Sequence, residues 1–547
     1  MPVKLRRVRA EKRSPRRRRH ETLSAVKFVI VHNHFRPGGV RRVIELAAPH
    51  LLRELPSARP ELILATGEAP DAPWLDGLRA RLPGGRVSCW VDPVLGYLAE
   101  QPGPQSPLRQ QLRRFWTRHL AGLTAADCLI WAHNQGLGRN LLLTRELVRQ
   151  CAARNLPLVL HHHDWWFDNR WQRWPETRRA GFRSLRQVAE VVFSPAPNVR
   201  HAAINRHDYV PLRNTLGARA GWLPNLMPRG VRPDAAKTRA ARRWLAGVTG
   251  EKNAPIWLVP CRLLRRKNLA EALLLTRWLR PEGWLVTTGG VSSADERAYH
   301  AKFQAAARRH HWRIRLGVLA GSETAKPSVP ALLAASEAIL LTSVQEGFGL
   351  PYLEAATAGR PLIARRLPNV APDLKTFGFQ LPQLYTEVRV PVTLLDWERE
   401  RARQTRFFQA WLRLLPPGLR RLAPPPPLLA RARPPASVAF SRLTLSAQLE
   451  VLAHPAEVSW QACVDLNPFL TVWRRRALTQ KLRVSPWPRT ADRWLSPRAY
   501  AARFAQLLRA RVPTRLPADA AMTAQQEFLV KTLAGAHRHP LLWHTNT

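Results

Sequence analysis

The sequence predicts an α/β protein with two tandem doubly wound domains that face each other across a cleft. Three observations predict this fold: short apolar runs alternate with segments of helical period, this series occurs twice, and a turn separates the two series. The 547 residues, 45% of them hydrophobic, are enough for two such domains. No apolar run approaches the ~18 residues that span a bilayer, which excludes an integral membrane protein.

The first domain is predicted over residues 24–222. An apolar strand at 28–31 ends in a polar turn containing Gly38 and Gly39, and the segment after the turn has helical period. This order forms the first half of a βαβ unit, whose turn lies at the ligand-binding edge of the sheet. Similar strands are predicted at 62–65, 128–132 and 158–162, with a helix starting at Leu141.

The second domain is predicted over residues 223–400, after a turn that contains Pro224 and Asn225. Its strands are predicted at 256–259, 284–287, 314–316 and 338–342. Beyond residue 400 the pattern weakens, and proline-rich stretches predict a linker rather than a core. Within this last part, 401–547, Ser496 as N-cap and Pro497 at the first helical position predict a helical segment.

The formal charge of +48 raises the question of a nucleic-acid partner. Eleven lysines leave 75 arginines among the 86 basic residues, and they are spread over the whole chain, which indicates a compositional bias. We therefore do not expect nucleic acid as a partner. Half of the first 20 residues are Lys or Arg without hydrophobic periodicity, so residues 1–23 are predicted to form a disordered basic tail. Peripheral contact of this tail with an anionic membrane stays open.

The same features predict a cytoplasmic protein. A secretory signal needs an apolar region of about 7 to 15 residues, whereas Lys27, His32 and His34 interrupt the single candidate. The five cysteines lack paired spacing, so neither a disulfide framework nor a zinc site is expected. A place at the inner membrane face is the alternative.

The most informative segment is 346–359. Pro351 can occupy the first helical position, which leaves an anion-binding turn before the helix. The N–H groups of that turn belong to Phe348, Gly349 and Leu350. Glu346 lies just outside the turn, and Glu354 lies one helical turn inside it. Two carboxylates beside one anion cost free energy unless they bind hydroxyl groups, as on a sugar and a ribose. The alternative is an ordinary helix whose glutamates complement its dipole.

Arg262 and Lys267 follow the strand at 256–259, at the same edge of the second domain. Arginine suits bidentate phosphate contacts and lysine supplies a compact charge, so the pair could neutralise a diphosphate leaving group without metal. Lys267 is the more informative residue because lysine is scarce in this chain.

These motifs resemble those of the retaining GT-B glycosyltransferases of group 1, which include sucrose-phosphate-synthase-like and bacterial mannosyl- and glucosyltransferases. The matches are a glycine loop, an Arg and Lys five apart and a Glu-x7-Glu signature: Gly38-Gly39, Arg262 and Lys267, and Glu346 and Glu354. The resemblance covers about residues 26–370 and is most specific over 256–370. It implies the GT-B architecture, an acceptor domain at 24–222 and a nucleotide-sugar domain at 223–400, both Rossmann-like.

The resemblance also implies roles for single residues. Those implied to bind the nucleotide-sugar donor are Gly38, Gly39, Arg262, Lys267, Phe348, Gly349, Leu350 and Glu354. Glu354 would bind the ribose, and Glu346 would lie at the transferred sugar as a catalytic residue. His163, in a strand that ends in His-Asp as in the family, would be the second catalytic residue, beside the reaction centre.

The histidines after residue 160 allow another interpretation. On a strand His161 and His163 share one face while His162 points away, so with Asp164 or Asp168 they could form a metal site. We expect no metal and no other cofactor, because the carboxylates are poorly placed and the resemblance implies none. A structural histidine is the alternative for His163. The four tryptophans that follow fit packing, with stacking on an acceptor sugar as the alternative: Trp165, Trp166, Trp171 and Trp174.

The sequence thus predicts a glycosyltransferase that moves a sugar from a nucleotide-sugar to a hydroxyl acceptor with retention of configuration. Two alternatives stay open. One is a glycoside phosphorylase on the same fold, and the other is a non-catalytic basic protein that binds RNA or a membrane surface.

Overall fold

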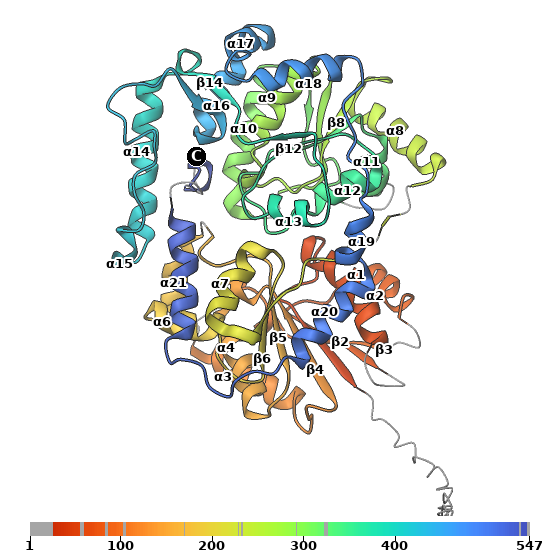
Figure 1. Cartoon of the computed structure of the whole chain (residues 1–547), viewed down its shortest axis with the longest axis vertical. Helices are drawn as coiled ribbons and strands as arrows, with labels where there is room; N and C mark the ends of the chain where they lie inside the picture. The colour runs from red at the N-terminus through yellow and green to blue at the C-terminus, as the bar shows by residue number, and fades with distance from the viewer. Residues whose placement is uncertain are drawn as a thin grey trace, which may run out of the picture.

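The fold is seen in a computed structural model (Figure 1). It describes residues 26–54, 60–82, 86–101, 106–168, 170–227, 229–230, 233–291, 293–321, 326–534 and 538–543. The basic tail expected at 1–23 lies outside the described residues. Every helix in the described ranges is too short or too polar to cross a membrane.

The first domain is built on a seven-stranded parallel sheet with the order β3-β2-β1-β4-β5-β6-β7. The strands are β1 (Lys27–Val31), β2 (Glu61–Thr66), β3 (Arg86–Val91), β4 (Cys128–His133), β5 (Leu158–His162), β6 (Val199–Ala203) and β7 (Ala220–Trp222). The chain moves outward over three strands and then returns past β1, which is the Rossmann order with its ligand-binding switch point between β1 and β4.

Helices cover both faces of this sheet: α1 (Gly39–Arg53), α2 (Ala72–Arg79), α3 (Ser106–His119), α4 (Leu141–Ala153), α5 (Trp174–Arg179), α6 (Leu185–Val192) and α7 (Arg206–Leu216). Alternate residues of β1 enter different cores, because successive strand side chains point to opposite faces. Phe28 and Ile30 pack with α1 and α2, whereas Val29 and Val31 pack with α3, α4 and α6.

The second domain repeats the plan in a six-stranded parallel sheet with the order β10-β9-β8-β11-β12-β13. Its strands are β8 (Ile256–Val259), β9 (Trp284–Thr287), β10 (Ile314–Arg315), β11 (Ala338–Leu341), β12 (Leu362–Arg365) and β13 (Gln383–Tyr385). Its helices are α8 (Ala235–Thr249), α9 (Leu269–Leu279), α10 (Arg297–Arg309), α11 (Val329–Ala335), α12 (Leu350–Ala358) and α13 (Ala371–Thr376). The expectation of two Rossmann-like, doubly wound domains is confirmed.

The segment 401–547 differs from the expected linker, because it contributes to the cores of both domains. Its helices, the first of which begins just before it at Trp397, are α14 (Trp397–Leu414), α15 (Pro417–Arg420), α16 (Leu445–Ala453), α17 (Ala456–Cys463), α18 (Pro468–Leu478), α19 (Asp492–Leu495), α20 (Pro497–Arg509) and α21 (Ala520–Leu533). The segment also contains β15 (Ser437–Ala439), which pairs with β14 (Arg389–Pro391). Phe408 and Phe528 enter the core of the first domain, and Trp460 enters that of the second. Figure 1 shows α14, α20 and α21 flanking the domains.

The carboxyl ends of the two sheets meet at the domain interface. Asn205, after β6, donates from Nδ2 to the backbone oxygen of Gly347, after β11, over 3.0 Å. A Cβ at Gly347 would lie 2.6 Å from the backbone oxygen of His163, which leaves room only for glycine. The loops expected to carry the chemistry therefore touch across this interface.

Candidate active site

The turn before α12 has the geometry of an anion site. Gly349 is the N-cap at φ +80°, and a Cβ there would lie 2.7 Å from the Tyr352 ring, so the turn requires glycine. Helix α12 begins at Leu350, directly after the left-handed N-cap Gly349, so Pro351 is its second residue. The expectation that Pro351 occupies the first helical position was wrong by one residue. The N–H groups of Phe348, Gly349 and Leu350 form no hydrogen bond with other described residues.

Glu346 is buried and bound by three side chains. Lys267 Nζ lies 2.5 Å from its Oε1, Arg266 Nη1 lies 2.9 Å from its Oε2, and Ser343 Oγ donates to Oε1 over 2.5 Å. Burial alone would raise the pKa of Glu346, but Lys267 and Arg266 hold that pKa down to about 2. The carboxylate is therefore ionised, and the two cations balance its charge. This balance removes the electrostatic cost that was expected for a carboxylate beside a bound anion.

The expected cationic pair divides between two environments. Lys267 is buried against Glu346, whereas the Arg262 side chain is exposed and forms no ion pair with other described residues. Arg266, to which the sequence reasoning gave no separate role, takes the second position on Glu346. Its contact could not be predicted because it depends on the 3₁₀ turn Arg265–Lys267, which turns adjacent side chains toward one carboxylate.

Glu354 lies apart from these cations in a half-buried position, and it forms no hydrogen bond with other described residues. Burial raises the pKa of Glu354, while Arg42 and Lys267 act in the opposite direction. Arg42 belongs to α1, just after Gly38 and Gly39, so the glycine loop of the first domain lies near α12 of the second. A Cβ on Gly39 would meet nothing within 4 Å, which leaves open space in front of this loop.

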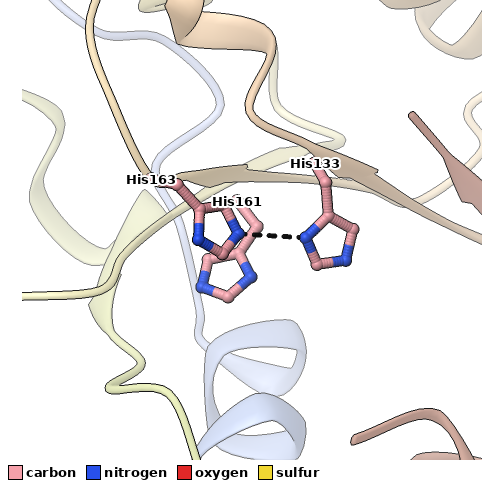
Figure 2. A group of neighbouring side chains, drawn as sticks. All are labelled: His133, His161 and His163. Atoms are coloured by element: carbon pink, nitrogen blue, oxygen red, sulfur yellow. Dashed lines mark hydrogen bonds between the residues drawn. The ribbon is translucent and has the colours of Figure 1, made fainter. Parts of the chain in front are cut away.

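His163 lies in a group of three buried histidines (Figure 2). Its Nε2 is 3.0 Å from Nδ1 of His133, and its ring centroid is 4.5 Å from that of His161. The expectation that His161 and His163 share a face is confirmed, since His162 points away and pairs with His201 at 3.0 Å. The sequence reasoning missed His133, although the parallel register places it opposite His161.

These three histidines could offer ligand atoms to a metal, because one nitrogen from each lies within 4.8 Å of the others. Both ring nitrogens of His161 are buried, and a contact with the backbone at Leu223 raises its pKa against the effect of burial. Burial lowers the pKa of all three rings, that of His163 to about 3, so the imidazoles are neutral. Asp164 and Asp168 are not part of this group, so the residue set considered for a metal from the sequence was wrong, and the third member of the group is His133.

The loop after β5 contains two contrasting carboxyl groups. Burial would raise the pKa of Asp164, but Arg170 and then Arg266 lower it, whereas burial raises the pKa of Asp168 to about 7. The four tryptophans of this region are buried in the core of the first domain: Trp165, Trp166, Trp171 and Trp174. The packing interpretation is confirmed, and these rings do not lie open to an acceptor sugar.

Two Rossmann-like domains whose facing edges carry this turn, these glutamates and these cations define a protein of the GT-B class. Residues 246–375, which lie within the second domain, match the family model described as glycosyl transferases group 1.

Similar proteins were found by sequence and by structure. A mannosylglucosyl-3-phosphoglycerate synthase of Petrotoga mobilis is 25% identical over 362 residues, which are 63% of this chain and 66% of the relative. A sucrose-phosphate synthase structure from Thermosynechococcus elongatus has a TM-score of 0.47 and 14% identity, covering 88% of this chain and 98% of that one. The Anabaena HepE structure in complex with UDP-glucose has a TM-score of 0.44 and 14% identity, covering 83% and 98%.

Proposed function

We propose that the protein is a metal-independent glycosyltransferase that moves a sugar from a nucleotide-sugar to a hydroxyl acceptor and retains the anomeric configuration. The observation that carries this proposal is Glu346, held ionised by Lys267 and Arg266 beside a helix N-terminus whose first N–H groups have no partner among the described residues. That arrangement lies inside the segment that matches the group 1 glycosyl transferases. The Petrotoga relative, named as a synthase of a mannosylglucosyl compound, supports sugar transfer.

In the proposed reaction the cations act on the leaving group. The bond between the anomeric carbon and the donor phosphate oxygen breaks, and negative charge grows on the diphosphate. Arg262, Lys267 and the N–H groups before α12 stabilise that charge from fixed positions. Because Lys267 is buried against Glu346, its position is set before the donor arrives, and little reorganisation is needed.

The acceptor attacks from the side that the diphosphate leaves. Its hydroxyl oxygen forms the new bond to the anomeric carbon, and its proton passes to the departing phosphate oxygen. Glu346 and His163 contact the transferred sugar and position it, while Glu354 binds the ribose hydroxyls. His163 is neutral, with Nε2 already engaged by His133, so it acts as a hydrogen-bonding group rather than as a cation.

We also propose a cytoplasmic enzyme. All five cysteines are free, and Cys128, Cys151, Cys261 and Cys463 are buried, which supports a reducing compartment. Cell fractionation with an antibody against the chain tests this location, and recovery in the secreted fraction would contradict it.

A donor screen tests the function. The purified chain is incubated with each common nucleotide-sugar, release of nucleoside diphosphate is measured, and NMR of the product reports the anomeric configuration. We expect one donor to be used, with retention. If no donor releases nucleoside diphosphate, the proposal is rejected. If the protein instead cleaves a glycoside with inorganic phosphate, it is a phosphorylase.

A further inference from the structure

Arg139 is an unpaired cation on the first domain. It lies in the loop between β4 and α4, at the carboxyl edge of the sheet, and its side chain is only partly exposed. No carboxylate in the described part of the chain lies within ion-pair distance of its guanidinium, and its Nε is buried without a partner there. A partly buried cation without a counter-charge is costly, which indicates a place kept for an anion.

The loop around Arg139 is tied to its surroundings by packing and hydrogen bonds. A Cβ on Gly138 would lie 2.6 Å from Cβ of Trp166, so the loop packs directly on the core. The backbone oxygen of Arg139 accepts a hydrogen bond from Leu98 N over 2.9 Å, and Asn140 Nδ2 donates to the Gly96 oxygen over 2.7 Å. These bonds join the loop to the segment after β3, so the guanidinium is presented from a fixed backbone.

Tyr97 contacts both Arg139 and His34. The guanidinium carbon of Arg139 lies 5.0 Å from the Tyr97 ring centroid, and the Tyr97 hydroxyl lies 2.9 Å from His34 Nε2. Burial and then the nearby Arg36, Arg262 and Arg139 lower the pKa of His34 to about 4. His34 is therefore a neutral group that feels the charges of both Arg139 of the first domain and Arg262 of the second.

Two further arginines face the same region, and each has a carboxylate partner. Arg173 pairs with Glu176 at 3.3 Å and with Asp295 of the second domain at 3.4 Å. Arg170 lies 3.9 Å from Asp164. Burial and then Arg173 lower the pKa of Arg139 to about 10, so it stays charged at neutral pH. Of these three arginines, Arg139 is thus the one without a carboxylate partner among the described residues.

We propose that Arg139 and Tyr97 form a subsite for an oxyanion, a phosphate or carboxylate, carried by the acceptor. The planar guanidinium offers two parallel N–H donors to such a group, and Tyr97 holds its plane in place. The subsite serves the acceptor because it is built from loops of the first domain, whereas the anion-binding turn for the donor lies in the second. This inference rests on the proposed function and gives the acceptor its chemical class.

Calorimetric titration tests the subsite with inorganic phosphate as the probe. The enzyme is first saturated with the nucleoside diphosphate of its donor, so that the turn before α12 is occupied. We expect Arg139→Met to weaken phosphate binding at least tenfold and to leave nucleotide affinity unchanged. The matched control is Arg145→Met, whose guanidinium lies 4.8 Å from the Phe182 ring in the same domain and should leave both affinities unchanged.

Three results would overturn the inference: phosphate that does not bind the wild type, equal phosphate affinity in wild type and Arg139→Met, or a loss of nucleotide affinity in Arg139→Met. The last result would move Arg139 to the donor site. If no nucleoside diphosphate binds, the proposed function fails, and titration of the unliganded wild type and both variants still decides whether Arg139 holds an oxyanion.

Discussion

The two Rossmann-like domains have the same order over their first six strands, but their facing edges differ in chemistry. The edge of the first domain carries buried neutral imidazoles, such as His133 and His163, and also Arg139, which forms no ion pair in the described part of the chain. The edge of the second carries a buried ionised glutamate held by two cations. The fold thus fixes where ligands bind, and the side chains at each strand end decide which ligand can bind.

The difference has an electrostatic cause. Burial lowers the pKa of His163 to about 3 because few nearby charges favour the imidazolium, whereas Lys267 and Arg266 overcome burial at Glu346 and lower its pKa to about 2. In the reaction proposed above, the neutral edge holds the sugar through hydrogen bonds, and the charged edge stabilises the charge that grows on the leaving group.

Removing a cation from the charged edge should have the largest effect. Lys267→Ala should lower turnover by roughly 10² to 10³, the size of losing one fixed electrostatic contact in a site of this kind. Steady-state kinetics with the donor from the screen measure the loss. Lys237→Ala is the matched control, since its ion pair with Asp234 lies on an exposed helix end and its removal should leave turnover unchanged. A folded Lys267→Ala enzyme of normal rate would remove the role of Lys267.

Acidification should lower the stability of the two domains at different pH values. A neutral buried histidine contributes full stability above its unfolded pKa near 6.5, and that stability is lost as pH falls toward the folded pKa. Glu346, with its folded pKa of about 2, keeps its contribution until pH falls below about 4.5. Between pH 6.5 and 4.5 the first domain should therefore weaken first. Asp168, with a pKa of about 7, and Asp208, with a pKa of about 6, act in the opposite direction, but the buried histidines of the first domain outnumber them.

Hydrogen-exchange protection factors measure this difference, comparing β4 and β5 with β8 and β11 at pH 7 and pH 5. The variant His161→Leu removes the central buried ring of the three, whose pKa burial lowers well below its ordinary value. At pH 5 it should recover about 2 kcal/mol of the stability that the wild type loses on acidification. Equal loss of protection in both sheets would contradict the contrast.

Glu354 and Glu346 should respond differently to neutralisation. Glu354→Gln should weaken donor binding about tenfold with a smaller effect on turnover, because a ribose contact exists in the ground state as well as in the transition state. Glu346→Gln should mainly lower turnover. Calorimetry with the nucleotide and parallel kinetics separate the two effects, and a melting curve controls for the helix-dipole contribution at α12. Undiminished affinity with collapsed turnover in Glu354→Gln would reject this division.

The smallest expected effect is that of a chelator. If the three histidines are hydrogen-bonding groups and no step uses a metal, then EDTA should change turnover by less than measurement error. Metal analysis of the purified protein provides the control. Activity lost with EDTA and restored by Mg²⁺, Mn²⁺ or Zn²⁺ would show that the neutral edge of the first domain is a metal site.

Much of the fold could be predicted because it is encoded locally. The strands Leu158–His162 and Ile256–Val259 have the predicted bounds, and Ser496 caps α20 by accepting a hydrogen bond from Ala499 N. Other elements could not be found this way. The edge strand β3 (Arg86–Val91) is only partly buried and lacks a continuous apolar run, and the helices after residue 400 have their apolar faces separated by prolines.

The sequence by itself determined the two Rossmann-like domains, the glycine turn before α12 and the presence of two glutamates and a cationic pair, because these depend on residue types at short spacing. Only the tertiary structure decided that Lys267 and Arg266 share Glu346, that His133 joins His163, and that Arg139 has no counter-charge among the described residues. These contacts join strand ends 30 to 80 residues apart in the sequence. Their chemistry depends on burial and on distance, which no local pattern of residues specifies.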